Sequence, residues 1–123
     1  MSHKILVVDD EKDILVTFQD LLEMEGYKVI CAHNARTALA LFHELKPDII
    51  ITDMMMPGMN GMDLIQVIRK GDDHPHIPII LMSAMASILH YEKKGWDIFI
   101  KKPSDIDTIL DSVRLLLGKS KSK

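Results

Sequence analysis

The chain has 123 residues and a mass of 14.0 kDa, which is the usual size of one domain and too short for two. Hydrophobic residues make up 47% of it and charged residues 27%, which excludes disorder, a collagen-like repeat and a disulfide-rich miniprotein. A net charge of −3 argues against a general nucleic-acid-binding protein, and no apolar run approaches the roughly 18 residues that a membrane span needs.

The first residues do not resemble a secretory signal. The apolar run from Ile5 to Val8 is followed at once by acidic residues, whereas a signal peptide carries a longer apolar region. Cys31 is the single cysteine, so an internal disulfide bond is excluded. We therefore expect a cytoplasmic location.

Short apolar runs alternate with amphipathic segments along the chain. The runs have the length and the β-branched residues of buried strands, and they cover 4–8, 27–32, 48–52, 79–82 and 98–100. Apolar residues at helical spacing predict helices over 11–25, 35–45, 62–70, 86–93 and 106–117. Asn34 and Ser104 stand where N-caps of the second and last helices belong, and Gly26 stands where the first helix should end.

This alternation of strands and helices predicts an α/β fold. Five strands would form a doubly wound parallel sheet of the flavodoxin-like type, in the order 2-1-3-4-5, with five helices on its two faces. We expect one domain over residues 1–118, followed by a charged tail or the start of a linker over 119–123.

Polar residues stand where four of the predicted strands end: Asp9 and Asp10, Asp53, Ser83, and Lys101-Lys102-Pro103. Ligands of this fold bind beyond the carboxyl ends of the strands, so these side chains should meet at one edge of the sheet. Three crowded carboxylates repel one another unless a cation intervenes, and Mg²⁺ prefers such oxygen ligands. Helix capping by Asp9 or Asp10 is the plainer alternative, but it leaves Asp53 unexplained.

A carboxylate beside Mg²⁺ can also attack phosphorus and form an aspartyl phosphate. Catalysis of such a transfer consists mainly of positioning and charge neutralisation. Lys102 would neutralise one phosphoryl oxygen, the Ser83 hydroxyl would donate a hydrogen bond to another, and the metal would take a third. The residues at this edge therefore suit phosphoryl transfer to Asp53.

Four segments resemble the receiver domain of two-component response regulators, and the resemblance extends from Lys4 to about Leu117. They are Ile5–Glu11, Asp53–Gly61 with its Asp-x-x-Met-Pro-x-x-Asn-Gly pattern, Leu81–Ala84, and Phe99–Pro103. The family has the fold of single-domain chemotaxis regulators. The resemblance implies a signalling module of a two-component system that is phosphorylated by a histidine kinase or a phosphotransfer protein.

The resemblance also implies roles for single residues. Asp53 would be the phosphoacceptor, with Lys102 and Ser83 as its catalytic partners and a cis peptide bond between Lys102 and Pro103. Mg²⁺ or Mn²⁺ would bind Asp10, Asp53 and the backbone carbonyl of Met55, with Asp9 acting through water. Such a domain catalyses only its own phosphoryl transfer and slow autodephosphorylation, so we do not expect a separate enzyme activity.

Signalling by the family uses a conformational switch. Ser83 shifts toward the phosphoryl group and an aromatic residue, here Phe99, turns inward. The face made by the expected helix 86–93, the strand 98–100 and the last helix would then bind an output domain or protein, or form a homodimer. No DNA-binding output domain, direct nucleic-acid contact or membrane contact is expected of this chain.

Three departures from the family fall near that face. Ser83 and Lys102 are 19 positions apart, a few fewer than is typical of relatives. Gly95-Trp96 stands where the family favours Gly-Ala, and Phe99 replaces a common tyrosine. These departures bear on the output partner rather than on the phosphorylation site.

The chain has nine methionines and only six aromatic residues. Seven of the nine lie in two segments beside the expected site: Met54, Met55, Met56, Met59, Met62, Met82 and Met85. Met55 and Met85 stand at positions that, in the family, influence attack by water, and neither can orient water through a strong hydrogen bond. We therefore expect slow hydrolysis of the phosphoryl group, although these methionines are equally well explained as core filling.

Several alternative functions have weaker support. His74 and His76 are not part of a zinc-like set, and the acidic segment after the first strand does not suit a nucleotide or flavin phosphate. An aspartyl phosphatase would need a second acid where Met55 stands. A receiver that binds proteins without switching is the remaining alternative.

Overall fold

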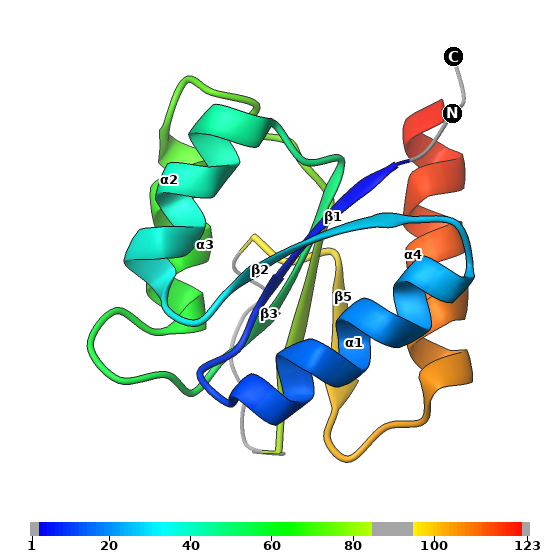
Figure 1. The fold of residues 1–123 in the computed structure, drawn as a ribbon. Helices are drawn as coiled ribbons and strands as arrows, with labels where there is room; N and C mark the ends of the chain where they lie inside the picture. The colour runs from blue at the N-terminus through cyan, green and yellow to red at the C-terminus, as the bar shows by residue number, and fades with distance from the viewer. Residues whose placement is uncertain (1–2, 85–94, 122–123) are drawn as a thin grey trace.

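The computed structural model describes residues 3–84 and 95–121, and Figure 1 shows its arrangement. Five parallel strands form one sheet in the order β2-β1-β3-β4-β5, which confirms the predicted topology. The strands are β1 (Lys4–Val8), β2 (Lys28–Ala32), β3 (Ile49–Asp53), β4 (Ile79–Ser83) and β5 (Ile98–Lys101).

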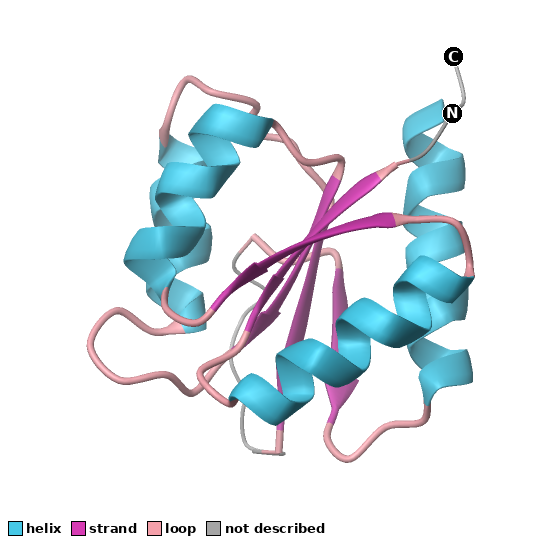
Figure 2. Cartoon of the chain, in the orientation of Figure 1, coloured by secondary structure: helices cyan, strands magenta, loops and turns pink. Residues whose placement is uncertain are grey.

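Helices cover both faces of this sheet (Figures 1 and 2). One face carries α2 (Ala35–Leu45) and α3 (Gly61–Lys70), and the other carries α1 (Lys12–Met24) and α4 (Ile106–Lys121). The described part of the chain thus contains four of the five predicted helices, and the expected helix 86–93 lies outside the described residues. Helix α4 continues to Lys121, into the segment expected to be a tail.

The central strands bury side chains on both faces because neighbouring residues of a strand point to opposite sides. Leu6 and Ile50 belong to the core under α2 and α3, whereas Ile5 and Ile49 belong to the core under α1 and α4. All four side chains are fully buried. This explains why the strands appear in the sequence as continuous apolar runs rather than as alternating patterns.

Polar side chains fix where the helices begin. The Asn34 carboxamide oxygen accepts a hydrogen bond from the Thr37 N–H at 2.8 Å, as expected of an N-cap. The predicted N-cap of the last helix was wrong by one residue, although its first helical residue is Ile106 as expected. Asp105, not Ser104, accepts the hydrogen bond of the Thr108 N–H at 2.8 Å, since the helix begins at Ile106.

Within the described residues, no helix is both long enough and apolar enough to cross a membrane.

Candidate functional site

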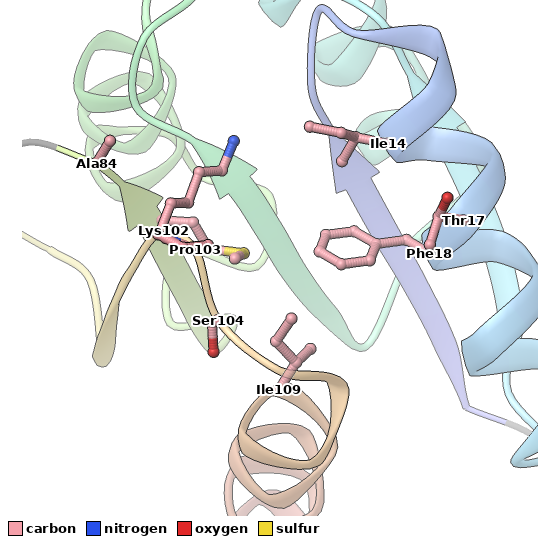
Figure 3. A pocket seen from close by; sticks show the side chains of 9 residues that line it. Ile14, Thr17, Phe18, Ala84, Lys102, Pro103, Ser104 and Ile109 are labelled. Atoms are coloured by element: carbon pink, nitrogen blue, oxygen red, sulfur yellow. The ribbon is translucent and has the colours of Figure 1, made fainter.

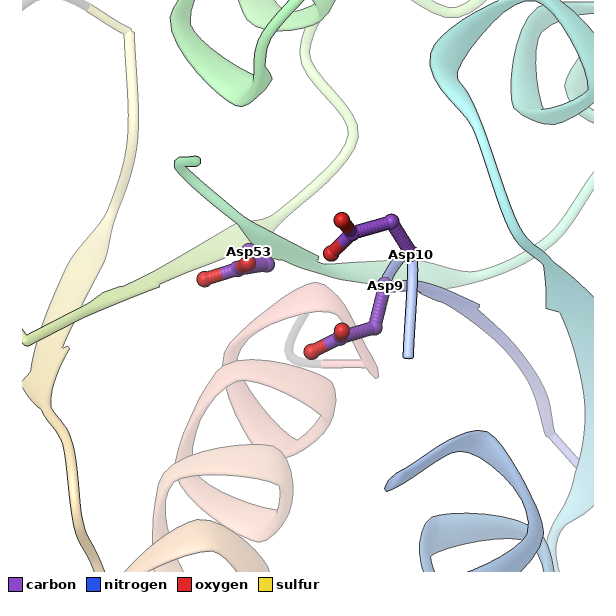
Figure 4. A group of neighbouring side chains, drawn as sticks. All are labelled: Asp9, Asp10 and Asp53. Carbon is purple, nitrogen blue, oxygen red and sulfur yellow. The ribbon is translucent and has the colours of Figure 1, made fainter. Parts of the chain in front are cut away.

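Three aspartates meet at the carboxyl edge of the sheet (Figure 4). Asp9 and Asp10 directly follow β1, and Asp53 is the last residue of the neighbouring β3. One carboxylate oxygen from each lies within 4.8 Å of the others. Asp9 and Asp53 are buried, while Asp10 is exposed and leaves the group open to solvent. The predicted convergence of the three side chains is therefore confirmed.

Lys102 joins two of these carboxylates. Its Nζ lies 3.1 Å from Oδ1 of Asp53 and 3.2 Å from Oδ2 of Asp9. Its backbone N–H donates to the Ser83 carbonyl at 2.9 Å, and its peptide bond to Pro103 is cis, as the resemblance implied. The backbone at the end of β5 thus holds the ammonium over the acidic group. Lys101, the residue before it, is exposed.

The two partners of this ion pair have different surroundings. Burial raises the pKa of Asp53; the hydrogen bond and charge of Lys102 oppose this, while the charges of Asp9 and Asp10 add to it. Burial alone would lower the pKa of Lys102, but the hydrogen bonds and charges of Asp53 and Asp9 outweigh it and raise that pKa. One ammonium therefore serves two buried carboxylates, and the site is short of positive charge.

Both carboxylate oxygens of Asp9 already have partners. Oδ1 accepts a hydrogen bond from the Glu11 N–H at 2.9 Å, and Oδ2 faces Lys102. The N-cap of α1 is Glu11, which makes no side-chain cap hydrogen bond, so Asp9 bonds to the N-cap residue rather than to the first N–H groups of the helix. The capping alternative is therefore not supported.

The structure describes three of the remaining predicted site residues, Ser83, Phe99 and Met55. Ser83 ends β4 and is fully buried, one position beyond Met82, the residue that pairs with Asp53 across the sheet. Phe99 is half-buried on the core under α2 and α3. The Met55 side chain is 54% exposed. Met85 lies outside the described residues.

The methionines near the site fall into two groups. Met56 and Met82 are buried in the core, and Met54, Met59 and Met62 pack against it, so these five fill space. Met55 is the exposed one among the described methionines of the two segments. The core-filling explanation therefore holds for most of the group but not for Met55.

Comparison with known proteins decides the family. A family model described as the response regulator receiver domain matches residues 5–114. The chain belongs to this family. The receiver domain of a Francisella response regulator is 31% identical with a TM-score of 0.89, and the match covers 98% of this chain and 100% of that one.

Two further structures are similar to this receiver domain. The receiver domain of a signal transduction histidine kinase from Syntrophus aciditrophicus is 29% identical, with a TM-score of 0.92 and coverage of 99% of this chain and 95% of that one. NtrX from Brucella abortus is 31% identical with a TM-score of 0.87, and the match covers 98% of this chain but 28% of that one.

One residue important for this receiver site was missed in the sequence. Gly61 ends the Asp53–Gly61 pattern but was given no role in the site, yet it is the first residue of α3 and its N–H donates to the Met54 carbonyl at 2.9 Å. A Cβ atom at this position would overlap the Asp53 carbonyl oxygen and lie 2.9 Å from the Met54 Cα. The pattern Asn60-x-x-Asp63, which forms a capping box here, could have located this helix start.

A cavity of about 430 Å³ adjoins the receiver site between α1, the ends of β4 and β5, and α4 (Figure 3). Ile14, Phe18 and Ile109 form its apolar wall, and Pro103 lines it beside Lys102. In Figure 3 the stem of Lys102 lines the cavity, while the ammonium group points away from Ile109. The cavity therefore shares Lys102 with the acidic group but offers little polar chemistry of its own.

Proposed function

We propose that this receiver domain accepts a phosphoryl group on Asp53 from a histidine kinase or a phosphotransfer protein and thereby switches a signalling surface. The observation that carries the proposal is the Lys102 ammonium held between buried Asp53 and Asp9, beside Asp10. The transferred phosphoryl group is negatively charged, so its transfer to Asp53 needs a cation beside that carboxylate, and Lys102 is in place to serve as one.

The acidic group fits a hard divalent cation such as Mg²⁺ or Mn²⁺. Within the described residues, the three aspartates are the one set of three or more acidic, histidine or cysteine side chains whose ligand atoms come this close. Asp10, Asp53 and the Met55 carbonyl would hold the ion directly. Asp9, whose oxygens are engaged, would act through water. Bound there, the ion would supply the missing positive charge.

In the proposed reaction a carboxylate oxygen of Asp53 attacks the donor phosphorus. An O–P bond to Asp53 forms, the bond from phosphorus to the donor's imidazole nitrogen or carboxylate oxygen breaks, and that donor atom keeps the electron pair. Lys102 neutralises one phosphoryl oxygen, and the Ser83 hydroxyl donates a hydrogen bond to another. The chain would catalyse only this transfer and the slow hydrolysis of the aspartyl phosphate to aspartate and inorganic phosphate, and act on no separate substrate.

The proposed switch connects Ser83 and Phe99 with the surface around β5 and α4. Phe99 packs against the core under α2 and α3 while remaining partly exposed, and the proposal requires its ring to turn further inward. This surface would bind an output domain or protein in the cytoplasm, or a second copy of the chain. The proposal includes no direct contact with nucleic acid or membrane.

Incubation with acetyl phosphate and Mg²⁺ tests the proposal. We expect the intact mass to rise by one phosphoryl group, and we expect no rise in Asp53→Asn or when Mg²⁺ is chelated. Asp20→Asn, on the exposed side of α1, is the matched control and should behave like the wild type. A wild type that gains no mass from acetyl phosphate, phosphoramidate or a phosphorylated histidine domain would contradict the proposed function.

The stability difference between the metal-free wild type and Asp53→Asn should depend on pH. Because burial raises the Asp53 pKa, the folded chain binds this proton more tightly than the unfolded chain. The wild type therefore loses stability relative to Asp53→Asn as the pH rises from the ordinary carboxyl pKa through the raised one. Urea unfolding of both proteins across this range measures it, and a wild type that gains stability relative to Asp53→Asn as the pH rises would be the opposite result.

Mg²⁺ should reverse this loss, because it binds the ionised carboxylate. At about 100 times its dissociation constant, the ion is expected to stabilise the fold by about 2.7 kcal/mol. Its affinity should weaken as the pH falls and Asp53 takes up a proton.

The phosphoryl group should be long-lived. Met55 offers water no strong hydrogen bond, and Met85 has the same chemistry. A half-life of seconds at neutral pH, measured by loss of radiolabel, would contradict this. Met55→Asn, which supplies a polar side chain, should shorten the half-life several-fold, while the same change at exposed Met24 should leave it unaltered.

A further inference from the structure

Arg69, at the end of α3 remote from Asp53, binds two other parts of the chain. Its Nε donates to the Gly95 carbonyl at 2.8 Å, and its Nη1 donates to the carbonyls of Pro75 and Ile77 at 2.6 and 2.7 Å. Its Nη2 lies 3.2 Å from Oδ2 of Asp97. The guanidinium thus joins α3, the loop before β4 and the segment that enters β5. We call Arg69, Gly95 and Asp97 with these bonds the α3 clamp.

The α3 clamp requires the donor geometry of an arginine side chain. The side chain is 19% exposed, and burial lowers the Arg69 pKa while Asp97 opposes that shift. Four N–H donors of the guanidinium are used in one plane, whereas a lysine has three donors on a single nitrogen and cannot reproduce the arrangement. Substitution of Arg69 by lysine would therefore break most of these bonds while retaining the charge.

Asp97 extends the clamp into the sheet. Its Oδ2 also accepts the Ile79 N–H at 2.8 Å, and its own N–H donates to the Ile79 carbonyl at 2.8 Å. These two bonds align the start of β5 with the start of β4. Arg69 thereby fixes the position from which β5, and with it Phe99, runs toward the acidic group.

Gly95 and Trp96 pack directly on α3. Gly95 has a φ of +98°, and a Cβ there would lie 2.6 Å from Cγ2 of Ile65 and 3.2 Å from Cγ of Arg69. The backbone therefore approaches α3 as closely as a glycine allows. Trp96 is 7% exposed within the core that contains Ile65, and Phe99 packs against the same core.

The opposite end of α3 contacts the phosphoacceptor. Gly61, the first residue of the helix, lies so close to the Asp53 carbonyl that it leaves no room for a Cβ, and its N–H is bonded to Met54. The ten-residue helix is thus attached to Asp53 at one end and to the start of β5 at the other. A helix of this length moves as a unit, because its backbone hydrogen bonds and its packed face resist bending.

We propose that Arg69 is a positioning residue that couples the phosphorylation site to the start of β5 through α3. A displacement of the Asp53 backbone on phosphorylation would shift α3, and the clamp would carry Gly95, Trp96 and Asp97 with it. This inference rests on the proposed function. Without the clamp, the site would change state without moving these residues, so a phosphoryl mimic would bind more tightly.

Trp96 reports this coupling directly, because it is the single tryptophan of the chain. Beryllofluoride with Mg²⁺ serves as the phosphoryl mimic, and calorimetry measures its affinity independently of fluorescence. In the wild type we expect saturation to change the Trp96 emission. Arg69→Lys should lose at least half of that change and bind beryllofluoride about threefold or more tightly. Asp97→Asn should shift both the emission change and the affinity in the same direction by a smaller amount.

Asp97→Asn is the milder variant, since its carboxamide oxygen can still accept both the Ile79 N–H and the Arg69 N–H, so the sheet register is preserved and only the charge of the pair is lost. Arg114→Lys, which alters an exposed arginine paired with Glu25 at 3.0 Å, is the matched control and should equal the wild type. A purely structural clamp would lower the melting temperature of folded variants while leaving the emission change and the affinity as in the wild type, and this would overturn the inference.

The wild type separates failure of the inference from failure of the proposed function. Binding of beryllofluoride with no change in Trp96 emission would overturn the inference alone. Absence of both beryllofluoride binding and phosphorylation would overturn the proposed function and the inference with it.

Discussion

Gly61→Ala is expected to destabilise the fold by about 1–3 kcal/mol and to slow phosphorylation of Asp53 at least tenfold. The new Cβ would overlap the Asp53 carbonyl oxygen and press on the Met54 Cα. These are backbone atoms at the end of a central strand, so they cannot move aside as a flexible side chain would. Either α3 or the Asp53 backbone must shift, and Asp53 then loses its alignment with Lys102.

Gly118→Ala provides the comparison, because nothing lies within 4 Å of a Cβ at that position in α4. That change should stabilise the chain slightly, by about 0.5–1 kcal/mol, as alanine favours a helix interior. Urea unfolding and the initial rate of phosphorylation by acetyl phosphate measure both variants. A Gly61→Ala variant with wild-type stability and rate would show that α3 does not bear on Asp53.

Lys102→Met is expected to lower the stability of the metal-free chain and to increase the stabilisation that Mg²⁺ provides. Without metal, Asp9 and Asp53 lose their shared ammonium and remain buried beside Asp10, which should cost about 1–3 kcal/mol of stability. Added Mg²⁺ should restore more stability to the variant than it adds to the wild type, because it replaces the missing charge. Phosphorylation should nevertheless fall about 100-fold or more, since one phosphoryl oxygen loses its cation.

Lys101→Met separates this role from a general loss of positive charge. Lys101 is the preceding residue and is exposed at the end of β5, so its replacement should change neither the metal-dependent stability nor the phosphorylation rate. Equal effects of the two substitutions would indicate that the net charge, rather than the contact of Lys102 with Asp53, matters.

The sequence was sufficient to predict the sheet and the residues at its carboxyl edge. Strands buried on both faces are continuous apolar runs such as Ile49–Ile51, and their ends are visible as the first polar residues. Because parallel strands end at one edge of the sheet, the topology alone predicts that Asp9, Asp53 and Lys102 lie close together.

The contacts that hold α3 could not be predicted in the same way. The overlap at Gly61 is a steric relation between two backbones, and the residue types around this glycine do not show which backbone atoms approach it. Two of the four bonds of Arg69 reach residues 26 and 28 positions away, and three of the four go to carbonyl groups, which every residue carries. The N-cap was predicted one residue too early because Ser104 and Asp105 are adjacent and both residue types are good N-caps.

The location of the phosphoryl group tests the central claim most directly. Borohydride reduces an aspartyl phosphate to homoserine, which marks the modified residue permanently for peptide mass spectrometry. After phosphorylation with acetyl phosphate and Mg²⁺, we expect homoserine at position 53 and unmodified aspartate at positions 9 and 10. Homoserine at Asp9 or Asp10, or none at Asp53 in a chain that has gained phosphoryl mass, would contradict the assignment of Asp53 as the acceptor.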